Sequence, residues 1–137
     1  MQLLAFDFGM SQIGLATGNA RTGIASELSV VNAKNGKPNW DEIRKLVNEW
    51  QPELCLVGLP LNMDGSESEL SGRARKFAHQ LEGRLGLKTD LVDERLSSFE
   101  AKGRAREAGH KGDYKAVPVD ALAAKILVEQ WLSNNKA

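Results

Sequence analysis

Hydrophobic residues recur along the chain with two different periods, and the first quarter of the sequence has the pattern of strands. Residues 1–9 are apolar on both alternating faces, which is typical of a strand buried at the centre of a sheet. A turn at 9–11 separates them from a second apolar stretch at 12–18, and a third strand is expected within 22–31. A polar turn at 32–38 follows. Connections this short predict three antiparallel strands.

Two amphipathic helices are expected next. Asn39 and Glu42 have the spacing of a capping box, and Pro52 ends the first helix. The second helix is expected over residues 67–85. In both helices apolar residues recur three and four positions apart, at Trp40, Ile43, Leu46, Val47 and Trp50 and at Leu70, Ala74, Phe77, Leu81 and Leu85. Each helix therefore has one face suited to packing on a sheet.

Short apolar strands alternate with helices in the remainder of the chain. Strands are expected at 54–59 and 87–92, a polar helix at 96–108, a loop at 109–116, and a last helix from Pro118 to about Leu132. Strands that are connected through helices pair in parallel. The predicted fold class is α/β, a single domain over residues 1–137 with a mixed five-stranded sheet and helices on both faces.

Length and composition are those of one globular domain. The 137 residues, 42% of them hydrophobic, are enough to bury a core without a disulfide or a metal. The one cysteine, Cys55, lies in an apolar run and is expected to be a buried, inert thiol in a reducing compartment. No basic leader begins the chain, and no apolar run approaches the ~20 residues of a membrane span. We therefore expect a cytoplasmic protein without a membrane partner.

Charge is unevenly distributed, although the formal net charge is zero. Residues 1–71 carry five Lys or Arg against nine Asp or Glu, whereas residues 72–115 carry eleven against seven. A basic segment beside an acidic one suits a phosphate backbone held next to a metal site. An ordinary solvated surface has the same composition, so charge alone leaves both interpretations open.

Acidic residues at the ends of predicted elements are the candidates for chemistry. Asp7 lies in the first strand on the same face as Leu3 and Ala5, where an ionised carboxylate is costly unless it is paired or binds a metal, and an Asp that caps the turn after the strand is the alternative. Asp120 lies in the first turn of the last helix, a position that acids also favour because of the helix dipole. Asp93 and Glu94 follow the fifth strand and point to opposite faces, so at most one of them meets Asp7.

Other polar residues are candidates for binding a substrate. Asn62 lies in a loop after a buried strand, where turn formation is the alternative explanation. Arg95 follows the acidic pair and suits a phosphate or a neighbouring carboxylate. The helix at 67–85 offers Arg73, Lys76 and Arg84, and further basic residues are Arg75, Lys102, Arg104, Arg106, Lys111 and Lys115. The alternative is that these basic residues form an ordinary solvent-exposed helix face without a binding function.

If the fold brings these three acids together, they form a predicted metal site. Bare carboxylates from the first strand, the fifth strand and the last helix would repel one another. A hard divalent cation such as Mg²⁺ or Mn²⁺ removes that repulsion and takes oxygen ligands readily. Two such ions activate a water molecule and stabilise the leaving oxygen of a phosphodiester. The lone cysteine and the unrelated positions of His79 and His110 argue against zinc.

Four segments together resemble the YqgF (RuvX) family. They are Asp7-Phe8-Gly9 with Ile13-Gly14-Leu15-Ala16, Val57-Gly58-Leu59-Pro60-Leu61-Asn62-Met63-Asp64-Gly65, Asp93-Glu94-Arg95-Leu96-Ser97-Ser98 with Glu100-Ala101, and Val119-Asp120-Ala121-Leu122-Ala123-Ala124. The resemblance extends over the whole chain. The family comprises bacterial pre-16S ribosomal RNA nucleases related to Holliday-junction resolvases.

The resemblance implies an RNase H-like fold and a catalytic, metal-binding set of Asp7, Glu94 and Asp120, with Asp93 as the alternative to Glu94. It implies Mg²⁺ or Mn²⁺ as cofactor, and precursor 16S ribosomal RNA and the small-subunit precursor as partners. Relatives have a basic residue just before the final acid, whereas here the nearest is Lys115. A resolvase acting on branched DNA and a non-catalytic RNA-binding factor are the competing functions.

Overall fold

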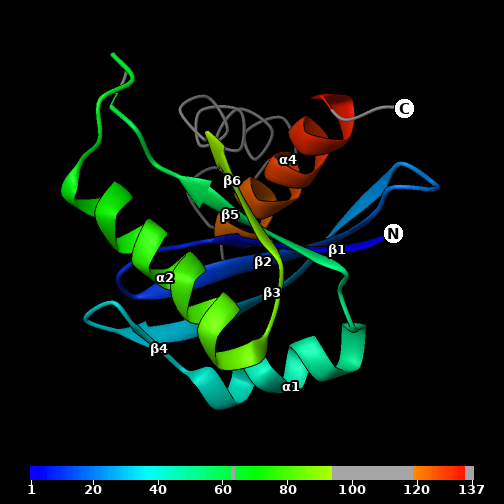
Figure 1. Cartoon of the computed structure of the whole chain (residues 1–137), viewed down its shortest axis with the longest axis horizontal. Helices are drawn as coiled ribbons and strands as arrows, with labels where there is room; N and C mark the ends of the chain where they lie inside the picture. Colours follow the sequence, from blue (N-terminus) through cyan, green and yellow to red (C-terminus); the bar gives the residue numbers. More distant parts are fainter. Residues whose placement is uncertain (63, 94–118, 135–137) are drawn as a thin grey trace.

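The computed structural model describes residues 1–62, 64–93 and 119–134, which form a six-stranded sheet with helices on both faces (Figure 1). The strand order across the sheet is β4-β3-β2-β1-β5-β6. The strands are β1 (Gln2–Asp7), β2 (Gln12–Asn19), β3 (Ile24–Lys34), β4 (Lys37–Pro38), β5 (Leu54–Leu59) and β6 (Thr89–Asp93). The helices are α1 (Trp40–Trp50), α2 (Glu69–Leu85) and α4 (Val119–Asn134). No described helix has the length and apolar character needed to cross a membrane.

The first half of the sheet is antiparallel, as predicted, but it contains one strand more than expected. β1 pairs with β2 and β2 with β3, all antiparallel. The prediction of a plain turn at 32–38 was wrong, because β3 continues to Lys34 and turns back at Asn35-Gly36 into β4. Both turn residues have positive φ, 51° and 78°, which is the backbone of the tight hairpin turn that Asn-Gly favours.

The second half of the sheet is parallel and brings three carboxyl ends of strands to one edge. β1 pairs in parallel with β5, and β5 pairs in parallel with β6. Because parallel strands run in the same direction, the carboxyl ends of β1, β5 and β6 all lie at the same edge of the sheet. The turn that follows β1 depends on Gly9, since a Cβ there would lie 2.5 Å from the Gln12 carbonyl oxygen.

Helices α1 and α2 cover one face of the sheet and bury the larger core (Figure 1). Ile43 and Val47 of α1 and Phe77 and Leu81 of α2 pack there against one set of alternating strand residues. That set includes Leu4, Phe6, Ile13, Leu15, Cys55 and Val57. The predicted apolar stripes are confirmed, although α2 begins at Glu69 after a Ser68 capping box and β6 begins at Thr89.

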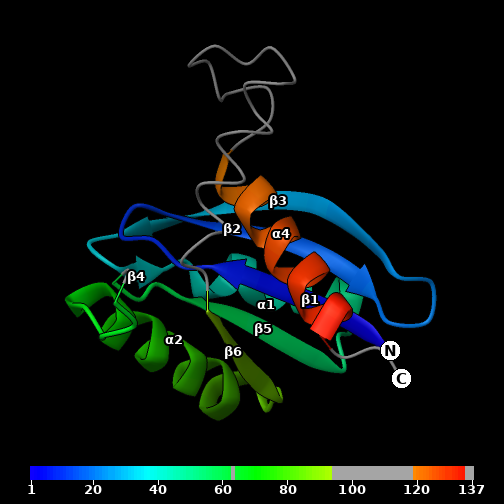
Figure 2. The same ribbon diagram turned by 90° about the horizontal axis from the view of Figure 1, so that it is seen from above.

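Helix α4 covers the opposite face (Figure 2). Ala124 and Val128 pack there against the other alternating set, Leu3, Ala5, Ala16, Leu54 and Leu56. Gly18 allows a close approach, because a Cβ at this position would lie 2.3 Å from Cγ1 of Val128. The predicted helix at 96–108, the loop at 109–116 and Pro118 lie outside the described residues.

Candidate functional site

Asp7 is the last residue of β1 and lies on the face that α4 covers. Leu3 and Ala5 pack against α4, and side chains alternate along a strand, so Asp7 continues their row. Its side chain is half-buried and takes part in interactions, while its partner across the antiparallel pair is Gly14. The strand thus presents this carboxylate at the sheet edge where β1, β5 and β6 end.

Glycines flank Asp7 on both neighbouring strands. Gly14 of β2 lies directly opposite, and Gly58 of β5 follows Val57, the partner of Phe6, so it is next to Asp7 in the parallel ladder. Both glycines are on the α4 face, since Ala16 and Leu56 two residues away pack there. The two strand positions next to this carboxylate therefore carry no side chain on this face. The role of Gly58 was missed in the sequence, because recognising it requires the strand register.

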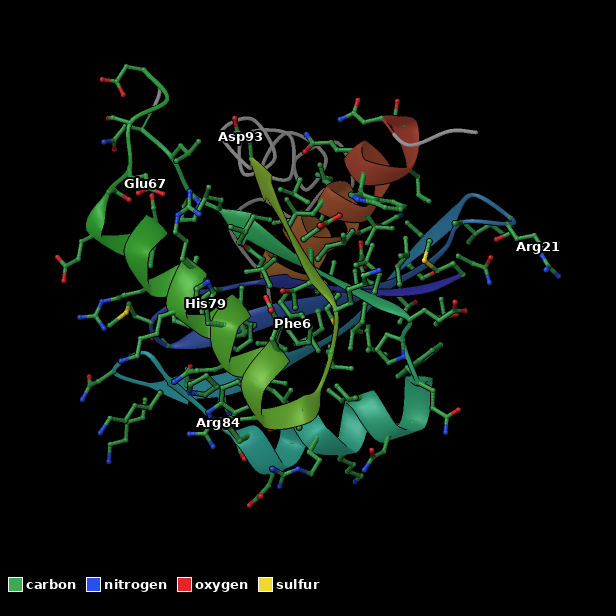
Figure 3. All side chains as sticks on the ribbon, in the orientation of Figure 1. Phe6, Arg21, Glu67, His79, Arg84 and Asp93 are labelled. Atoms are coloured by element: carbon green, nitrogen blue, oxygen red, sulfur yellow. The ribbon has the colours of Figure 1, made fainter. Side chains whose placement is uncertain are left out.

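Asp93, one of the two acids between which sequence reasoning left the choice open, ends β6. Val92 packs with the α4 cluster, so strand alternation directs the Asp93 side chain to the opposite face from Asp7, while Asp93 at the strand tip also borders a hollow next to Gln130 and Ser133 of α4. Asp93 is exposed at the tip of the strand (Figure 3). Glu94, the other candidate, lies outside the described residues.

Helix α4 begins at the end of the sheet where β1 ends. Val128 packs on Gly18, which is the partner of Leu3 near the start of β1, and Trp131 donates a hydrogen bond to Asp90 of β6 (3.4 Å). The helix therefore runs from the Asp7 end of the sheet toward the start of β1. In Figure 2 its N-terminal end is orange and its C-terminal end is red. Asp120 is the second residue of α4, and only its backbone is described.

The donors that the structure describes fit a hard cation but do not by themselves complete a site. Carboxylate oxygen is the ligand that Mg²⁺ and Mn²⁺ prefer, and the strand residues opposite and beside Asp7 are glycines. Among the described side chains, no group of three His, Cys, Asp or Glu is gathered closely enough to hold a metal. Two of the three predicted ligands, Glu94 and the side chain of Asp120, are not among them.

Asn62 lies in the loop after β5, and its amide group takes part in the structure of that loop. Its Nδ2 donates to Oγ of Ser66 (3.0 Å), and Ser66 in turn donates to a carboxylate oxygen of Asp64. An isolated bridge between Leu61 and Glu67 closes the loop. The turn role considered for Asn62 is thus present.

The predicted basic residues of α2 lie on the other side of the sheet from Asp7. Arg73, Lys76 and Arg84 line a cavity beside the β3–β4 turn, together with Lys37 of β4. Phe8, the residue after Asp7, also lines this cavity. Arg95 and Lys115 lie outside the described residues. The structure therefore brings Arg73 and Lys76 together, but not onto the face of the sheet that holds Asp7.

Cys55 is buried in the core below α1 and α2, as the sequence predicted. Burial raises the pKa of its thiol to about 12. A thiol that stays protonated is neither a metal ligand nor a nucleophile at neutral pH. Cys55 is therefore a packing residue and not part of a functional site.

The sequence profile of the RuvX family, described as Holliday junction resolvase, matches residues 1–134. The chain belongs to the RuvX family of nucleases. A relative from Azotobacter vinelandii, named "Putative pre-16S rRNA nuclease", is 53% identical over 135 residues, which cover 98% of this chain and 95% of that protein. A relative of the same name from Pseudomonas syringae pv. tomato is 52% identical over 134 residues, or 97% and 92% of the two chains.

Solved structures with the same fold include two Holliday-junction resolvases. Thermus thermophilus RuvC in complex with a Holliday junction aligns over 98% of this chain and 95% of its own, with a TM-score of 0.55 and 16% identity. The fowlpox virus resolvase aligns over 98% and 99%, with a TM-score of 0.61 and 10% identity. The predicted RNase H-like fold is thereby confirmed, with six strands in place of five.

Proposed function

We propose that this RuvX-family nuclease hydrolyses phosphodiester bonds of precursor 16S ribosomal RNA, in the cytoplasm, during maturation of its 5′ end. The observation that supports this proposal is the position of Asp7 at the carboxyl ends of three neighbouring strands, between two glycines and below α4. Curated relatives that are more than half identical are named for the same RNA. The small-subunit precursor is then the assembly on which the enzyme acts.

In this proposal Asp7, Glu94 and Asp120 hold Mg²⁺ or Mn²⁺. Glu94 is preferred to Asp93 because the alternation of β6 directs Asp93 away from the face of Asp7. Bound divalent ions supply a water molecule with lowered pKa and stabilise the charge on the leaving oxygen. The carboxylates of the chain fix the site, and the glycines beside Asp7 leave the scissile phosphate room to approach it.

Polar residues around this edge of the sheet are proposed to orient the RNA. Asn62 lies in the loop after β5, next to the strand that carries Asp7, and suits a sugar or phosphate oxygen. Arg95 and Lys115 are proposed phosphate contacts from the segment between β6 and α4. Arg73 and Lys76 are proposed contacts for RNA beyond the cleaved bond itself, since they lie on the other face.

The experiment that tests this function is cleavage of a precursor 16S ribosomal RNA fragment by the purified protein with Mn²⁺. Asp7→Asn keeps the size of the side chain and removes its charge, and we expect it to abolish cleavage while the melting temperature stays near that of the wild type. Glu94→Gln is expected to behave in the same way. Asp93→Asn is the matched control, and we expect it to retain activity.

Full activity of Asp7→Asn would refute the catalytic proposal, and loss of activity only in Asp93→Asn would exchange the roles of the two acids. A four-way DNA junction belongs in the same assay, because the family description and the solved structures concern Holliday-junction resolvases. Preferential cleavage of the junction would favour a resolvase. Undiminished RNA binding and an unchanged cellular role in Asp7→Asn would favour a non-catalytic factor.

A further inference from the structure

A basic cavity lies between α2 and the β3–β4 hairpin, on the face of the sheet opposite Asp7. Its volume is about 470 Å³, within the roughly 300–1,000 Å³ of typical ligand pockets. Four cations line it, Lys37 from β4 and Arg73, Lys76 and Arg84 from α2, and none of the described residues that line it is acidic. In a chain of zero net charge, this concentration of positive charge indicates an anionic ligand.

The cations form a line and not a single cradle. Arg73, Lys76 and Arg84 follow one another at spacings of three and eight residues, so they share one side of α2. Eleven residues of helix separate the first from the last, which corresponds to about 16 Å along the axis. One phosphate group cannot contact all of them. The arrangement suits a chain of phosphates in preference to a free phosphate or a mononucleotide.

Aromatic side chains form the floor of the same cavity. Trp40 stacks on Phe77 with 5.6 Å between ring centroids, and the guanidinium of Arg84 lies 4.9 Å from the Trp40 ring. Trp40 thereby holds the planar Arg84 cation in place. Unpaired bases stack on aromatic rings and on arginine planes of this kind, whereas a duplex keeps its base faces hidden.

The hairpin turn completes the cavity wall and fixes Arg73 beside it. The Gly36 amide donates to the Met10 carbonyl (2.9 Å), which ties the β3–β4 turn to the turn after β1. A Cβ at Gly36 would lie 3.3 Å from Nη1 of Arg73, so the guanidinium lies directly against the glycine. Arg73 also pairs with Glu69 (3.4 Å) at an exposed position. Neither Lys37 nor Lys76 has an acidic partner among the described residues.

The cavity extends to Phe8, the residue that follows Asp7 at the edge of the sheet. Phe8 lines the cavity and packs on Phe77 (5.3 Å between centroids), and it directly follows Asp7, whose side chain points to the other face. An RNA strand bound at Asp7 would have to pass around the turn after β1 to reach the cavity. We propose that this cavity binds the unpaired RNA that flanks the cleaved bond, with its phosphates on Lys37, Lys76 and Arg73 and a base against Arg84. The proposal rests on the proposed RNA substrate, but not on catalysis.

The test is binding of a fluorescent single-stranded RNA hexamer in EDTA, which separates the cavity from the metal site. The variant is Lys37→Gln/Lys76→Gln, and Arg21→Gln is the control, since Arg21 lies at the far end of the molecule in the β2–β3 turn (Figure 3). Loss of two phosphate contacts reduces the slope of log K against log salt by roughly 1.4 and the affinity on the order of tenfold at 0.1 M salt. Arg21→Gln is expected to match the wild type, as is Asp7→Asn.

Equal hexamer affinity and salt slope in the double variant and the wild type, at equal melting temperatures, would overturn the proposal. Competition by adenosine monophosphate as strong as that by the hexamer would also overturn it, because the cavity would then be a nucleotide site. The same holds for competition by a polyglutamate peptide of matched charge, which would indicate an acidic protein partner. Cleavage by Asp7→Asn tests the active site, whereas hexamer binding tests the cavity. A variant that loses cleavage but binds the hexamer normally therefore shows that the two sites can fail separately.

Discussion

The contact between Gly18 and Val128 sets the position of α4, and adding one methyl group at Gly18 tests how far the site depends on it. A Cβ at residue 18 would lie 2.3 Å from Cγ1 of Val128 but 3.6 Å from its Cβ, which is an ordinary contact. Relief of the clash requires a movement of roughly 1 Å, because carbon atoms prefer about 3.5 Å or more. Valine in a helix has one strongly preferred rotamer, so α4 is expected to move before the side chain does.

Overpacking of this kind costs about 1–3 kcal/mol. With an entropy of unfolding of about 2.1 cal/mol/K per residue, each kcal/mol lowers the melting temperature of a 137-residue chain by about 3–4 °C. Displacing Asp120 relative to Asp7 by about 1 Å is expected to reduce cleavage by up to about 100-fold. Gly18→Ala is therefore predicted to lose far more activity than stability.

Val128→Ala removes the methyl group that clashes and provides a matched rescue. Alone it is expected to cost about 2 kcal/mol through lost burial and the cavity left behind. Combined with Gly18→Ala it is expected to cost no more than it does alone, which corresponds to a coupling energy of about 1–3 kcal/mol. The assay is thermal melting and Mn²⁺-dependent cleavage for all four proteins. Additive melting shifts, or wild-type cleavage by Gly18→Ala, would refute the reasoning.

Three further predictions follow from individual side chains. Phe77→Ala removes a residue that is 1% exposed and contacts three aromatic rings, and we expect a loss of about 3–5 kcal/mol in urea unfolding; a loss below about 1 kcal/mol would contradict the packing. The Cys55 thiol, whose pKa burial raises to about 12, is expected to resist a disulfide reagent at pH 8 until the protein unfolds, and rapid labelling of folded protein would show that it is accessible. Asp120→Asn is expected to weaken Mn²⁺ binding by at least tenfold in a calorimetric titration, and an unchanged titration would reject its role as a ligand.

The sequence predicts the parts of the fold that depend on local pattern. The stripes that include Ile43 and Phe77 indicated which faces of α1 and α2 are buried, and the structure confirms both. The turn at Asn35-Gly36 was recognised as polar, but the two-residue strand after it was missed. Lys37 and Pro38 have no strand pattern of their own, and they pair only because β3 extends far enough to receive them.

The candidate site shows the same division between local and long-range information. Alternation assigned Asp7 to the face of Leu3 and Ala5, and the structure shows that these two residues pack against α4. The flanking position of Gly58 follows only from the register of β5 against β1, which no single segment specifies. The positions of the basic residues along α2 were visible in the sequence. Whether Arg73 lies on the face of the sheet that holds Asp7 or on the opposite face depends on how the helix packs.

The most direct test of the central claim is a crystal structure of the protein grown with Mn²⁺, with the ion located by its anomalous scattering. The proposal predicts a peak about 2.0–2.2 Å from a carboxylate oxygen of Asp7, with oxygens of Glu94 and Asp120 in the same coordination sphere. A peak elsewhere, or an Asp7 carboxylate paired with a lysine or arginine in place of the ion, would contradict it.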